Sequence, residues 1–437
     1  MKSIWAPALA AAAALTLALS TAADPDPFAG PAAIGQSPAF PGQTRAASPS
    51  AQTSYRVETV AEGLDHPWSL AWLPDGEMLV TERPGRLRLV SPDGALSRPV
   101  SGVPAVRAQD TGGLLDVVLD PAFAENQLVY LTYLEPRDGG SGIAVARARL
   151  SDAEGTPSLE ALTVIFRATP ALDNALNVGS RLTFGPDGYL YVTLGDRMTA
   201  SEQAQDLTSD LGKIVRIAPD GSIPPDNPFT SAWGARPEIF TLGHRNPEGL
   251  AFDPARGVLW EHENGPKGGD KVNVIRPGAN YGWPQISYGA DYSGEAIGIG
   301  TQKPGMAQPV YYWDPSIAPS GLAVYTGDLF PAWKGDLLVG ALKGRRLVRL
   351  HIQDGRVAEE EVLLNELKER IRDVRQGPDG AVYVLTDNSA GRILRLTPSA
   401  DQSIREIAHD LPAHARRDRR LLARRKREGV VPARPAV

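Results

Sequence analysis

Residues 177–197 read NVGSRLTFGPDGYLYVTLGDR, two short apolar runs on either side of a Pro-Asp-Gly turn. In such a turn proline presets φ, the aspartate side chain accepts a hydrogen bond from nearby backbone, and glycine adopts positive φ without steric cost. We therefore expect a tight antiparallel hairpin, with Asn177 on the loop that leads into its first strand.

The same hairpin recurs along the chain. Close copies are LPDGEMLVTERPGRLRLV from residue 73 and GPDGAVYVLTDNSAGRILRLTP from residue 377, and looser copies start at residues 114, 250 and 322. The six copies begin near residues 68, 113, 180, 249, 321 and 371, so the shortest interval is 45 residues (113 − 68) and the longest is 72 (321 − 249). The shortest interval matches the ~40–50-residue repeats of propeller blades, and the longer ones leave room for inserted loops.

The strand segments indicate how these hairpins pack. YLYVTL and LLVGAL are apolar on both faces, as expected when each sheet lies between two neighbours, and convincing amphipathic helices are scarce. The sequence therefore predicts an all-β fold, a six-bladed β-propeller, which also limits exposed sheet edges. A β-sandwich and a β-helix are the alternatives, although inserted loops disfavour the regular period of a solenoid.

Four regions are expected. Residues 1–23 have one Lys, an apolar run and small residues near their end, which is typical of a signal peptide and predicts a periplasmic or secreted protein. Residues 24–53 are predicted to be a disordered Pro/Ala/Ser-rich linker, residues 54–398 the propeller, and residues 399–437 a basic, disordered tail. The ten Lys or Arg and five Asp or Glu of residues 401–437 give +5 within a chain of −6, which leaves −11 (−6 − 5) for the remainder.

Composition excludes several classes of protein. There is no cysteine, so disulfides and thiolate metal sites are excluded. The basic tail has no interleaved aromatic residues of the kind that stack on single-stranded bases, so we expect no nucleic-acid partner. The N-terminal apolar run is shorter than the ~20 residues of a membrane span, so we expect no transmembrane domain in the mature protein, with a retained anchor as the alternative.

Four cationic residues stand at inter-blade positions. Loops at one end of a propeller channel collect residues from every blade, and the set comes from three blades: Arg245, Lys343, Arg370 and Arg372. An isolated Arg is most simply a surface charge. However, the spacing of Arg370 and Arg372 puts both side chains on one face of a strand, and a pair of guanidinium groups suits carboxylates or phosphates.

The loop ENGPKGGDKVN at residues 263–273 is a candidate cation site. Its Gly and Pro residues leave backbone carbonyls outside regular pairing, and Ca²⁺ binds backbone oxygens readily. A plain Gly-rich turn is the alternative.

Several segments together resemble one known family. They are GGLLDVVLDPAF, GSRLTFGPDGYLYVTLGDR, LGKIVRIAPDGSIPPDNPF, GHRNPEGLAF, ENGPKGGD, NYGWP, ALKG and RIRDVRQGPDGAVYVLTD. In this order, over about residues 55–398, the chain resembles the glucose/sorbosone dehydrogenase family, the soluble quinoprotein aldose sugar dehydrogenases. The resemblance implies a six-bladed propeller that holds pyrroloquinoline quinone (PQQ) and Ca²⁺ over the channel mouth. It also implies an exported oxidoreductase that oxidises the anomeric carbon of aldose sugars to lactones and passes electrons to a soluble acceptor.

The resemblance also assigns roles to single residues. The three carboxylates of PQQ would be neutralised by Lys343, Arg370 and Arg372, with further cofactor contacts from Asn246, Ser316 and the residue at position 111, Thr111. Arg245 would stabilise charge as the quinone is reduced. The carbonyls of Gly265 and Pro266 would hold Ca²⁺, which would act as a Lewis acid.

Three positions depart from the family pattern. The general base of the family is a His four residues before the Arg of the G[GS]RL motif, and here that position is Asn177, whose neutral amide cannot accept a proton. Thr111 stands where the family has Gln, and Asn264 stands where His or Gln often precedes the Gly-Pro pair. Loss of a general base would lower the rate by about 10²- to 10⁴-fold if nothing replaces it.

Other residues could supply the missing base. His66, His244 and His262 are the candidate histidines, although each is more simply a structural or surface residue. Asp196 matches the family pattern and could act on a water, or could orient neighbouring loops. Apart from the dehydrogenase, two further hypotheses remain open: a non-catalytic propeller binding module that keeps the pocket, and a Ca²⁺-dependent lactonase, for which the ENGP loop offers mainly carbonyls in place of carboxylates.

Overall fold

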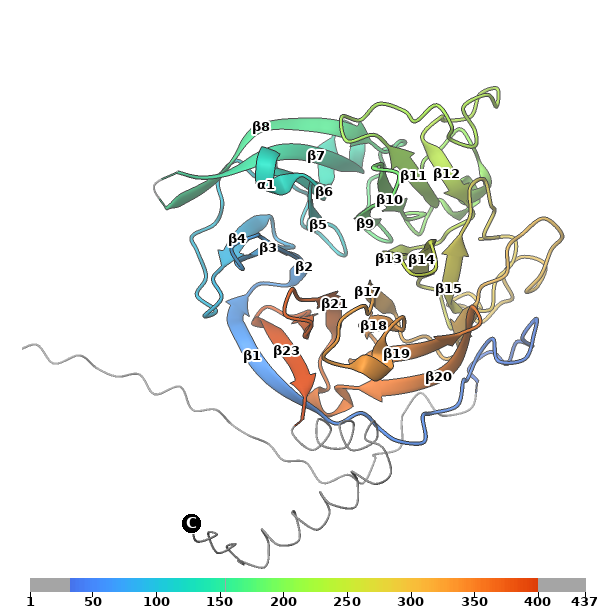
Figure 1. Ribbon diagram of the computed structural model, residues 1–437. Helices are drawn as coiled ribbons and strands as arrows, with labels where there is room; N and C mark the ends of the chain where they lie inside the picture. Colours follow the sequence, from blue (N-terminus) through green and yellow to red (C-terminus); the bar gives the residue numbers. More distant parts are fainter. Residues whose placement is uncertain (1–31, 154, 400–437) are drawn as a thin grey trace, which may run out of the picture.

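The structure, a computed structural model, describes residues 32–153 and 155–399. Six antiparallel sheets surround a common centre in the arrangement of a propeller (Figure 1). The all-β, six-bladed β-propeller predicted from the repeats is therefore confirmed. The predicted signal peptide and the basic tail beyond residue 399 lie outside the described residues.

The first three blades follow one another along the chain. Blade 1 has three strands, namely β2 (Pro67–Trp72), β3 (Met78–Glu82) and β4 (Arg86–Val90). Blade 2 has four, namely β5 (Leu114–Leu119), β6 (Leu128–Arg137), β7 (Gly140–Ala153) and β8 (Thr156–Arg167). Blade 3 is β9 (Gly179–Phe184), β10 (Leu190–Leu194), β11 (Lys213–Ile217) and β12 (Ile239–Leu242).

The remaining blades are also four-stranded. Blade 4 is β13 (Pro247–Asp253), β14 (Val258–Glu263), β15 (Asp270–Ile275) and β16 (Tyr311–Trp313). Blade 5 is β17 (Pro319–Val324), β18 (Leu337–Ala341), β19 (Arg346–Gln353) and β20 (Arg356–Leu363). Blade 6 is β21 (Ile371–Gln376), β22 (Val382–Thr386), β23 (Gly391–Pro398) and β1 (Tyr55–Leu64). Short helical turns lie in the loops, namely α1 (Phe123–Asn126), η1 (Ser201–Gln205), η2 (Pro331–Trp333) and η3 (Asn365–Leu367).

Blade 6 closes the ring with a strand from the other end of the chain. β1 pairs antiparallel with β23, from Tyr55 opposite Pro398 to Leu64 opposite Gly391. The backbone hydrogen bonds of this pair therefore join the first and last strands of the propeller. The hairpin repeats did not predict this pairing, because no turn connects the two strands.

The Pro-Asp-Gly turns have the predicted geometry. Gly76, Gly188 and Gly380 have φ values of 91°, 76° and 77°. In the turn of the opening stretch, Oδ1 of Asp187 accepts a hydrogen bond from the backbone N–H of Tyr189 at 3.2 Å. β9 and β10 pair antiparallel on either side of this turn, so residues 177–197 are the inner hairpin of blade 3.

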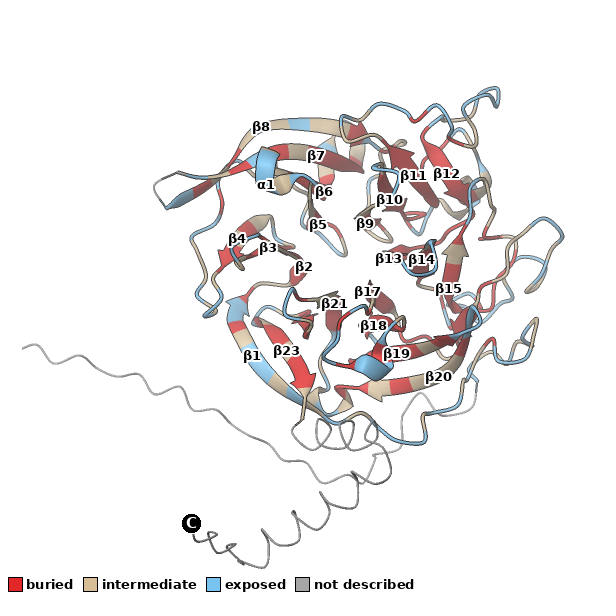
Figure 2. Ribbon diagram, in the orientation of Figure 1, coloured by how far each residue is buried: buried red, intermediate tan, exposed pale blue. Residues whose placement is uncertain are grey.

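Apolar side chains are buried between the blades. The strands near the centre are almost wholly buried, whereas the outer strands β1 and β8 include exposed residues (Figure 2). One core cluster joins Leu115 of blade 2 to Val192 of blade 3, and another joins Val272 of blade 4 to Val339 of blade 5. Strands that are apolar on both faces are explained by this packing.

An ion network fills the central channel. The Arg181 guanidinium lies 3.0 Å from Asp373, and the Arg375 guanidinium lies 2.8 Å from Asp373 and 3.0 Å from Asp116. Arg181 also lies over the ring of Trp68, 4.2 Å from its centroid. Two guanidinium groups and two carboxylates from the innermost strands of blades 2, 3 and 6 are thus paired. The Arg of the GSRL motif is therefore part of the channel and not of a pocket.

The segment before β1 differs from the expected disordered linker. In the described part, residues 32–53, the backbone N–H groups of Ala33 and Gly35 donate to the carboxylate of Asp314 at 2.9 and 3.0 Å. The side chain of Gln43 is fully buried and donates to the carbonyl of Pro309 at 2.9 Å. Composition could not reveal these contacts, because they join residues more than 260 positions apart in the chain.

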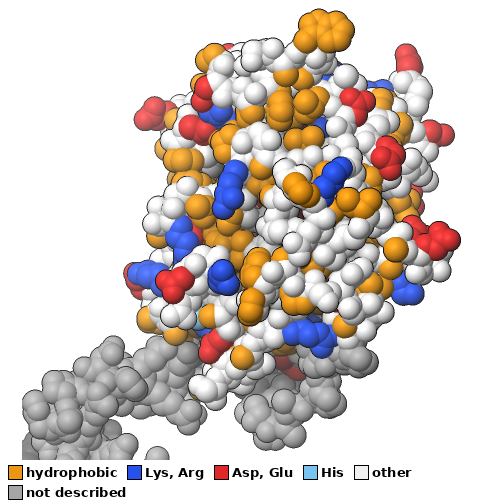
Figure 3. Space-filling model, turned by 90° about the vertical axis from the view of Figure 1, so that its right-hand side faces the viewer, with side chains coloured by type: hydrophobic (Ala, Val, Ile, Leu, Met, Phe, Trp, Pro, Cys, Tyr) orange, Lys and Arg blue, Asp and Glu red, His pale blue; other side chains and the backbone are white. Residues whose placement is uncertain are grey.

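The outer surface carries charges of both signs. On the face at the right-hand side of Figure 1, Lys and Arg side chains are interspersed with Asp and Glu side chains and with apolar patches (Figure 3). This face of the described chain therefore presents no continuous basic surface. Among residues 32–153 and 155–399, no helix has the length and apolar character needed to cross a membrane.

Candidate active site

Two pockets open at one end of the propeller. Neighbouring strands run in opposite directions, so loops that enter the innermost strands meet loops that leave the second strands at the same end. The first, called here the Arg245 pocket, has a volume of about 420 Å³, and its lining includes Asp196, Glu202, Arg245, Pro266, Trp283 and Tyr292. The second, called here the three-arginine pocket, has a volume of about 440 Å³, and its lining includes His66, Arg83, Thr111, Arg370, Arg372 and Asp387.

In the three-arginine pocket, Arg370 and Arg372 converge on Asp387. Their Nη2 atoms lie 2.8 and 3.1 Å from Oδ2 of Asp387. Nη1 of Arg372 also donates to Oε2 of Glu248 at 2.8 Å. Both guanidinium groups therefore contact one carboxylate of the protein itself, which the sequence did not single out.

Arg83 is a third guanidinium that the sequence did not single out. It follows β3 and donates from Nη1 to the backbone carbonyl of Asp110. Burial lowers the pKa of Arg83, and the nearby positive charge of Arg372 lowers it further. The only sequence signal was an Arg after a strand, in TERPGR, and nothing local distinguishes such an Arg from a surface residue.

The charges of this pocket suit an anionic ligand. Burial raises the pKa of Asp387, but the guanidinium groups of Arg372 and Arg370 outweigh it and hold that pKa well below the ordinary value. The lining has three Arg and two Asp side chains, Asp110 and Asp387, and Glu248 outside the lining also pairs with Arg372. The buried Nε atoms of Arg83 and Arg372 have no hydrogen-bond acceptor among the described residues. A ligand carboxylate would supply one.

Thr111 and His66 complete the wall of this pocket. The hydroxyl of Thr111 donates to the carbonyl of Ala175 at 2.7 Å, so its polar atom is held by the protein. Nδ1 of His66 lies 2.7 Å from Oδ1 of Asp65. Thr111 therefore contributes shape to the pocket, while His66 brings a carboxylate-paired imidazole to its edge.

In the Arg245 pocket, two backbone carbonyls converge on a cation. Nη1 of Arg245 donates to the carbonyls of Gly265 and Asn264 at 2.9 and 3.1 Å. The guanidinium lies 5.4 Å from the ring centroid of Trp283. Pro266 lines the same pocket. The loop predicted to hold a metal thus directs oxygen ligands toward one positively charged group.

Asp270 holds this loop in place. Its carboxylate accepts hydrogen bonds from the backbone N–H of Gly265 at 2.8 Å, the hydroxyl of Ser316 at 2.9 Å and the backbone N–H of Ile317 at 2.7 Å. A Cβ at Gly265 would lie 2.3 Å from the carbonyl oxygen of Gly268, so glycine is required there. Ser316, predicted to contact the cofactor, donates to Asp270 and so anchors the loop, and its contact with a cofactor stays a prediction.

Asn177 and Asp196 are joined directly. Asn177 has a φ of 45°, and its Nδ2 donates to Oδ1 of Asp196 at 2.9 Å. Oδ1 of Asp196 also accepts the backbone N–H of Met198 at 2.7 Å, and Oδ2 accepts Nε1 of Trp283 at 2.8 Å. Burial raises the pKa of Asp196, although Arg245 and the hydrogen bonds oppose it. Asp196 lines the Arg245 pocket, whereas Asn177 lines neither pocket.

Three residues predicted to contact the cofactor line neither pocket, namely Asn246, Ser316 and Lys343. Oδ1 of Asn246 accepts the backbone N–H of Gly179 at 3.0 Å, and its Nδ2 donates to Oδ1 of Asn264 at 3.1 Å, so it joins blade 3 to blade 4. Lys343 is exposed in the turn between β18 and β19. The structure therefore groups Arg370, Arg372 and Thr111 in one pocket and Arg245 and Pro266 in the other.

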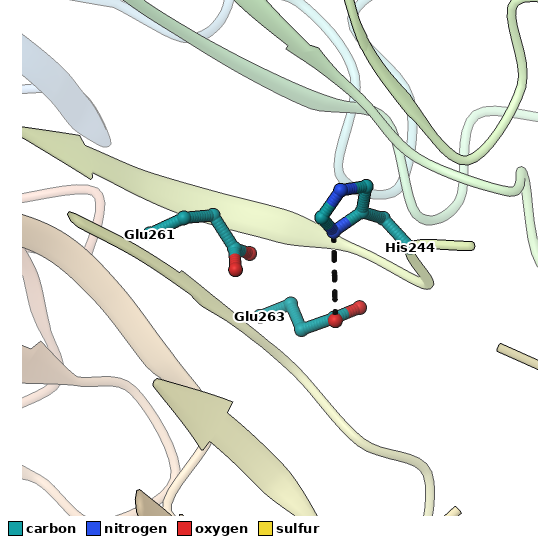
Figure 4. Close-up of side chains that lie close together, drawn as sticks. All are labelled: His244, Glu261 and Glu263. Carbon is teal, nitrogen blue, oxygen red and sulfur yellow. Dashed lines mark ion pairs between the residues drawn. The ribbon is translucent and has the colours of Figure 1, made fainter. Parts of the chain in front are cut away.

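A buried polar cluster is formed by His244, Glu261 and Glu263 (Figure 4). His244, Glu261 and Glu263 present possible metal-ligand atoms within 4.8 Å of one another. However, Nζ of Lys271 lies 2.9 Å from Oε1 of Glu263, so an ammonium group already supplies positive charge there. Oε2 of Glu263 in turn accepts the backbone N–H of Arg245. The cluster therefore fixes the backbone from which the Arg245 side chain extends.

Two of the candidate histidines are enclosed. Nε2 of His244 lies 2.9 Å from the hydroxyl of Thr241, and Nε2 of His262 lies 2.9 Å from the carbonyl of Gly321. Both side chains are fully buried and line neither pocket. Burial lowers the pKa of both, to about 4 for His262. Neither is placed to exchange a proton with a ligand.

Known proteins are similar to this chain in both sequence and fold. A family profile described as Glucose / Sorbosone dehydrogenase matches residues 64–395. The aldose sugar dehydrogenase YliI of Escherichia coli (strain K12) is 44% identical over 353 residues, covering 80% of this chain and 94% of that protein. The crystal structure of the soluble aldose sugar dehydrogenase from Escherichia coli in the apo-form has a TM-score of 0.77 at 43% identity, covering 79% of this chain and 100% of that chain. The PQQ-bound form of aldose sugar dehydrogenase from Streptomyces coelicolor has a TM-score of 0.66 at 31% identity, covering 80% and 100%.

Proposed function

This chain belongs to the glucose/sorbosone dehydrogenase family, and we propose that it is a PQQ-dependent sugar dehydrogenase that oxidises the anomeric carbon of aldoses to lactones. The observation that carries the proposal is the presence of two different pockets at one end of the propeller. One pocket has three guanidinium groups, two of which, those of Arg83 and Arg372, have a buried Nε without an acceptor among the described residues. The other pocket places Arg245 among oxygen ligands.

The three-arginine pocket is proposed to hold the carboxylates of PQQ. Arg83, Arg370 and Arg372 offer donors in fork geometry, which suits carboxylates. The buried Nε atoms of Arg83 and Arg372 would gain acceptors they now lack. The exposed Lys343 and the more distant Asn246 remain proposed contacts from the resemblance. When bound, the quinone supplies the two-electron acceptor for the reaction, while the protein supplies orientation and electrostatics.

The loop at Asn264 to Pro266 is proposed to bind Ca²⁺. Backbone carbonyls are ligands that this ion prefers, and the carbonyls of Asn264 and Gly265 already converge on a positive group, the Arg245 guanidinium. A bound ion would therefore require that Arg245 move away from these carbonyls. After this movement, the guanidinium of Arg245 would be available to stabilise negative charge on an oxygen of the quinone or of the sugar.

The two alternative functions are less well supported. A binding module without redox chemistry is not favoured, because several relatives that span the propeller are named as aldose sugar dehydrogenases. A Ca²⁺-dependent lactonase needs carboxylate ligands at its metal, whereas the loop at residues 264–266 presents carbonyls. Export by the N-terminal segment and transfer of electrons to a soluble acceptor are part of the proposal and rest on the sequence.

The test uses the full chain, because residues 32–53 pack against the propeller. Metal is removed with EDTA, PQQ is titrated by absorbance with Ca²⁺ or with Mg²⁺ as the control, and aldoses are then added with an artificial electron acceptor. We expect tight binding that needs Ca²⁺, followed by turnover. Absence of PQQ binding in both metals would refute the proposal, and binding without oxidation of any aldose would favour the binding module.

A further inference from the structure

The proposed reaction needs a group that accepts the proton of the anomeric hydroxyl. Asn177 cannot be that group, because a neutral amide does not accept a proton at ordinary pH. Its side chain is also occupied, since Nδ2 donates to Oδ1 of Asp196. His244 and His262 are fully buried outside both pockets. Another residue of the described site must therefore accept the proton.

Asp196 lines the Arg245 pocket, whereas Asn177 does not. Asp196 follows β10, lines the Arg245 pocket and is only 1% exposed. Arg245 lines the same pocket, and its positive charge acts to lower the pKa of Asp196. The other two carboxylates of this lining, Glu202 and Asp291, are exposed. Asp196 is thus the buried carboxylate among the described residues that line this pocket.

The hydrogen bonds of Asp196 leave one oxygen able to accept a proton. Oδ1 is used twice, by Asn177 Nδ2 and by the backbone N–H of Met198. Oδ2 accepts one bond, from Nε1 of Trp283. A carboxylate has about four acceptor sites in all, so Oδ2 has one left. Because Asn177 and Trp283 hold the carboxylate from two sides, this oxygen is fixed in orientation.

We propose that Asp196 is the general base of this chain, taking the role that the family gives to a histidine at the position of Asn177. The inference rests on the proposed function. The anomeric O–H bond of the sugar breaks and its proton passes to Oδ2 of Asp196. The C1–H bond breaks as C1–O becomes a carbonyl, and that hydrogen leaves with its electron pair to the quinone oxidant. Asn177 then acts as a positioning residue that donates to the base.

The environment of Asp196 supports this role. Burial raises the pKa of its carboxyl group, and a raised pKa makes the carboxylate a stronger base at neutral pH. The facing charged groups are Arg245 from the loop before β13, Glu202 from η1 and Asp291 from the loop between β15 and β16. The positive charge of Arg245 opposes this rise in the pKa of Asp196.

The test compares Asp196→Asn with the matched control Asp220→Asn, an exposed carboxylate whose side chain bonds only within its own turn. For each full-length variant, absorbance titration measures PQQ binding and thermal shift measures sugar binding. Turnover is then measured. We expect Asp196→Asn to bind PQQ and sugar within about threefold of the parent and to lose about 10²- to 10⁴-fold in turnover. Asp220→Asn is expected to match the parent.

Two further variants keep the inference falsifiable if Asp196→Asn folds poorly. Formate should restore part of the turnover of Asp196→Ala, because a small carboxylate can occupy the vacated space. Asn177→His removes the amide that donates to Oδ1 of Asp196, so it should not raise turnover by more than about tenfold, since one general base contributes about 10²–10⁴ and is already present. An inert parent that Asn177→His activates would overturn the inference, as would full turnover in Asp196→Asn. Failure of PQQ to bind the parent would refute the proposed function itself, and the role of Asp196 would fall with it.

Discussion

Arg372 and Asp387 form a buried ion pair, with Nη2 of Arg372 3.1 Å from Oδ2 of Asp387 and both side chains almost fully enclosed. The same guanidinium lies 2.8 Å from Glu248 through Nη1. One cation from blade 6 therefore compensates two carboxylates from different parts of the ring. This pair belongs at once to the stability of the propeller and to the proposed cofactor pocket.

Arg372→Met should destabilise the fold strongly. It would leave Asp387 and Glu248 without their shared buried cation, and removing one partner of a buried pair costs about 3–5 kcal/mol. The free energy of unfolding, measured with urea, checks this value. Arg56→Met is the control, because Arg56 is exposed on β1 and its contact with Glu58 is 3.9 Å long, and such surface pairs contribute about 0–1 kcal/mol. Equal effects of the two substitutions would contradict the importance of the buried pair.

Arg83→Met should weaken PQQ binding with little loss of stability. Arg83 is only partly buried and its charge is not paired with a carboxylate at close range in the described chain, so its removal leaves no buried charge behind. A charge-assisted hydrogen bond contributes about 1.5–3 kcal/mol, so we expect the Kd for PQQ to rise by about 10- to 100-fold. Absorbance titration gives the Kd, with Arg98→Met as the exposed control. An unchanged Kd would remove Arg83 from the cofactor site.

Lys271 and Glu263 should prove energetically coupled. Their charged atoms are 2.9 Å apart and both side chains are buried. Lys271→Met leaves the Glu263 carboxylate without this partner, whereas Glu263→Gln with Lys271→Met removes both charges. We expect a coupling free energy of about 0.5–3 kcal/mol from the double-mutant cycle. Additive effects in urea unfolding would show that the pair does not hold the backbone behind Arg245.

Lys213 should make stability depend on pH above neutrality. Its Nζ donates to the carbonyls of Gln203 and Leu211 at 2.7 and 2.8 Å, and burial lowers the pKa of Lys213 from 10.5 to about 7. Between these values the unfolded chain binds more protons than the folded chain, so the free energy of unfolding rises with pH. The contribution has a maximum slope of about 1.4 kcal/mol per pH unit.

Lys213→Met removes that titration. We expect the unfolding free energy of the parent minus that of the variant to rise steadily from pH 7 to pH 9.5. The same urea series at constant ionic strength measures it. A difference that stays constant over this range would mean that Lys213 remains charged in the folded protein.

Much of the fold could be predicted because its signals are local. Gly188 follows Pro-Asp in a turn whose positive φ of 76° favours glycine, and the two other close copies at Gly76 and Gly380 repeat it. Recurrence of the same hairpin six times then indicated a propeller. The spacing of Arg370 and Arg372 predicted one shared face of a strand. However, β21 begins at Ile371, so only Arg372 lies in the strand, although both side chains contact Asp387.

The sequence alone determined the hairpins, the number of blades, the family and the end of the propeller where polar loops gather. Only the tertiary structure decided that Arg83 and Arg372 line the same pocket and that Asp196, not Asn177, lines the Arg245 pocket. It also decided that Ser316 anchors a loop and that β1 pairs with β23. The reason is physical. Turns and strand faces follow from the dihedral preferences of neighbouring residues, whereas these contacts join different blades or loops and depend on how six sheets pack around one channel.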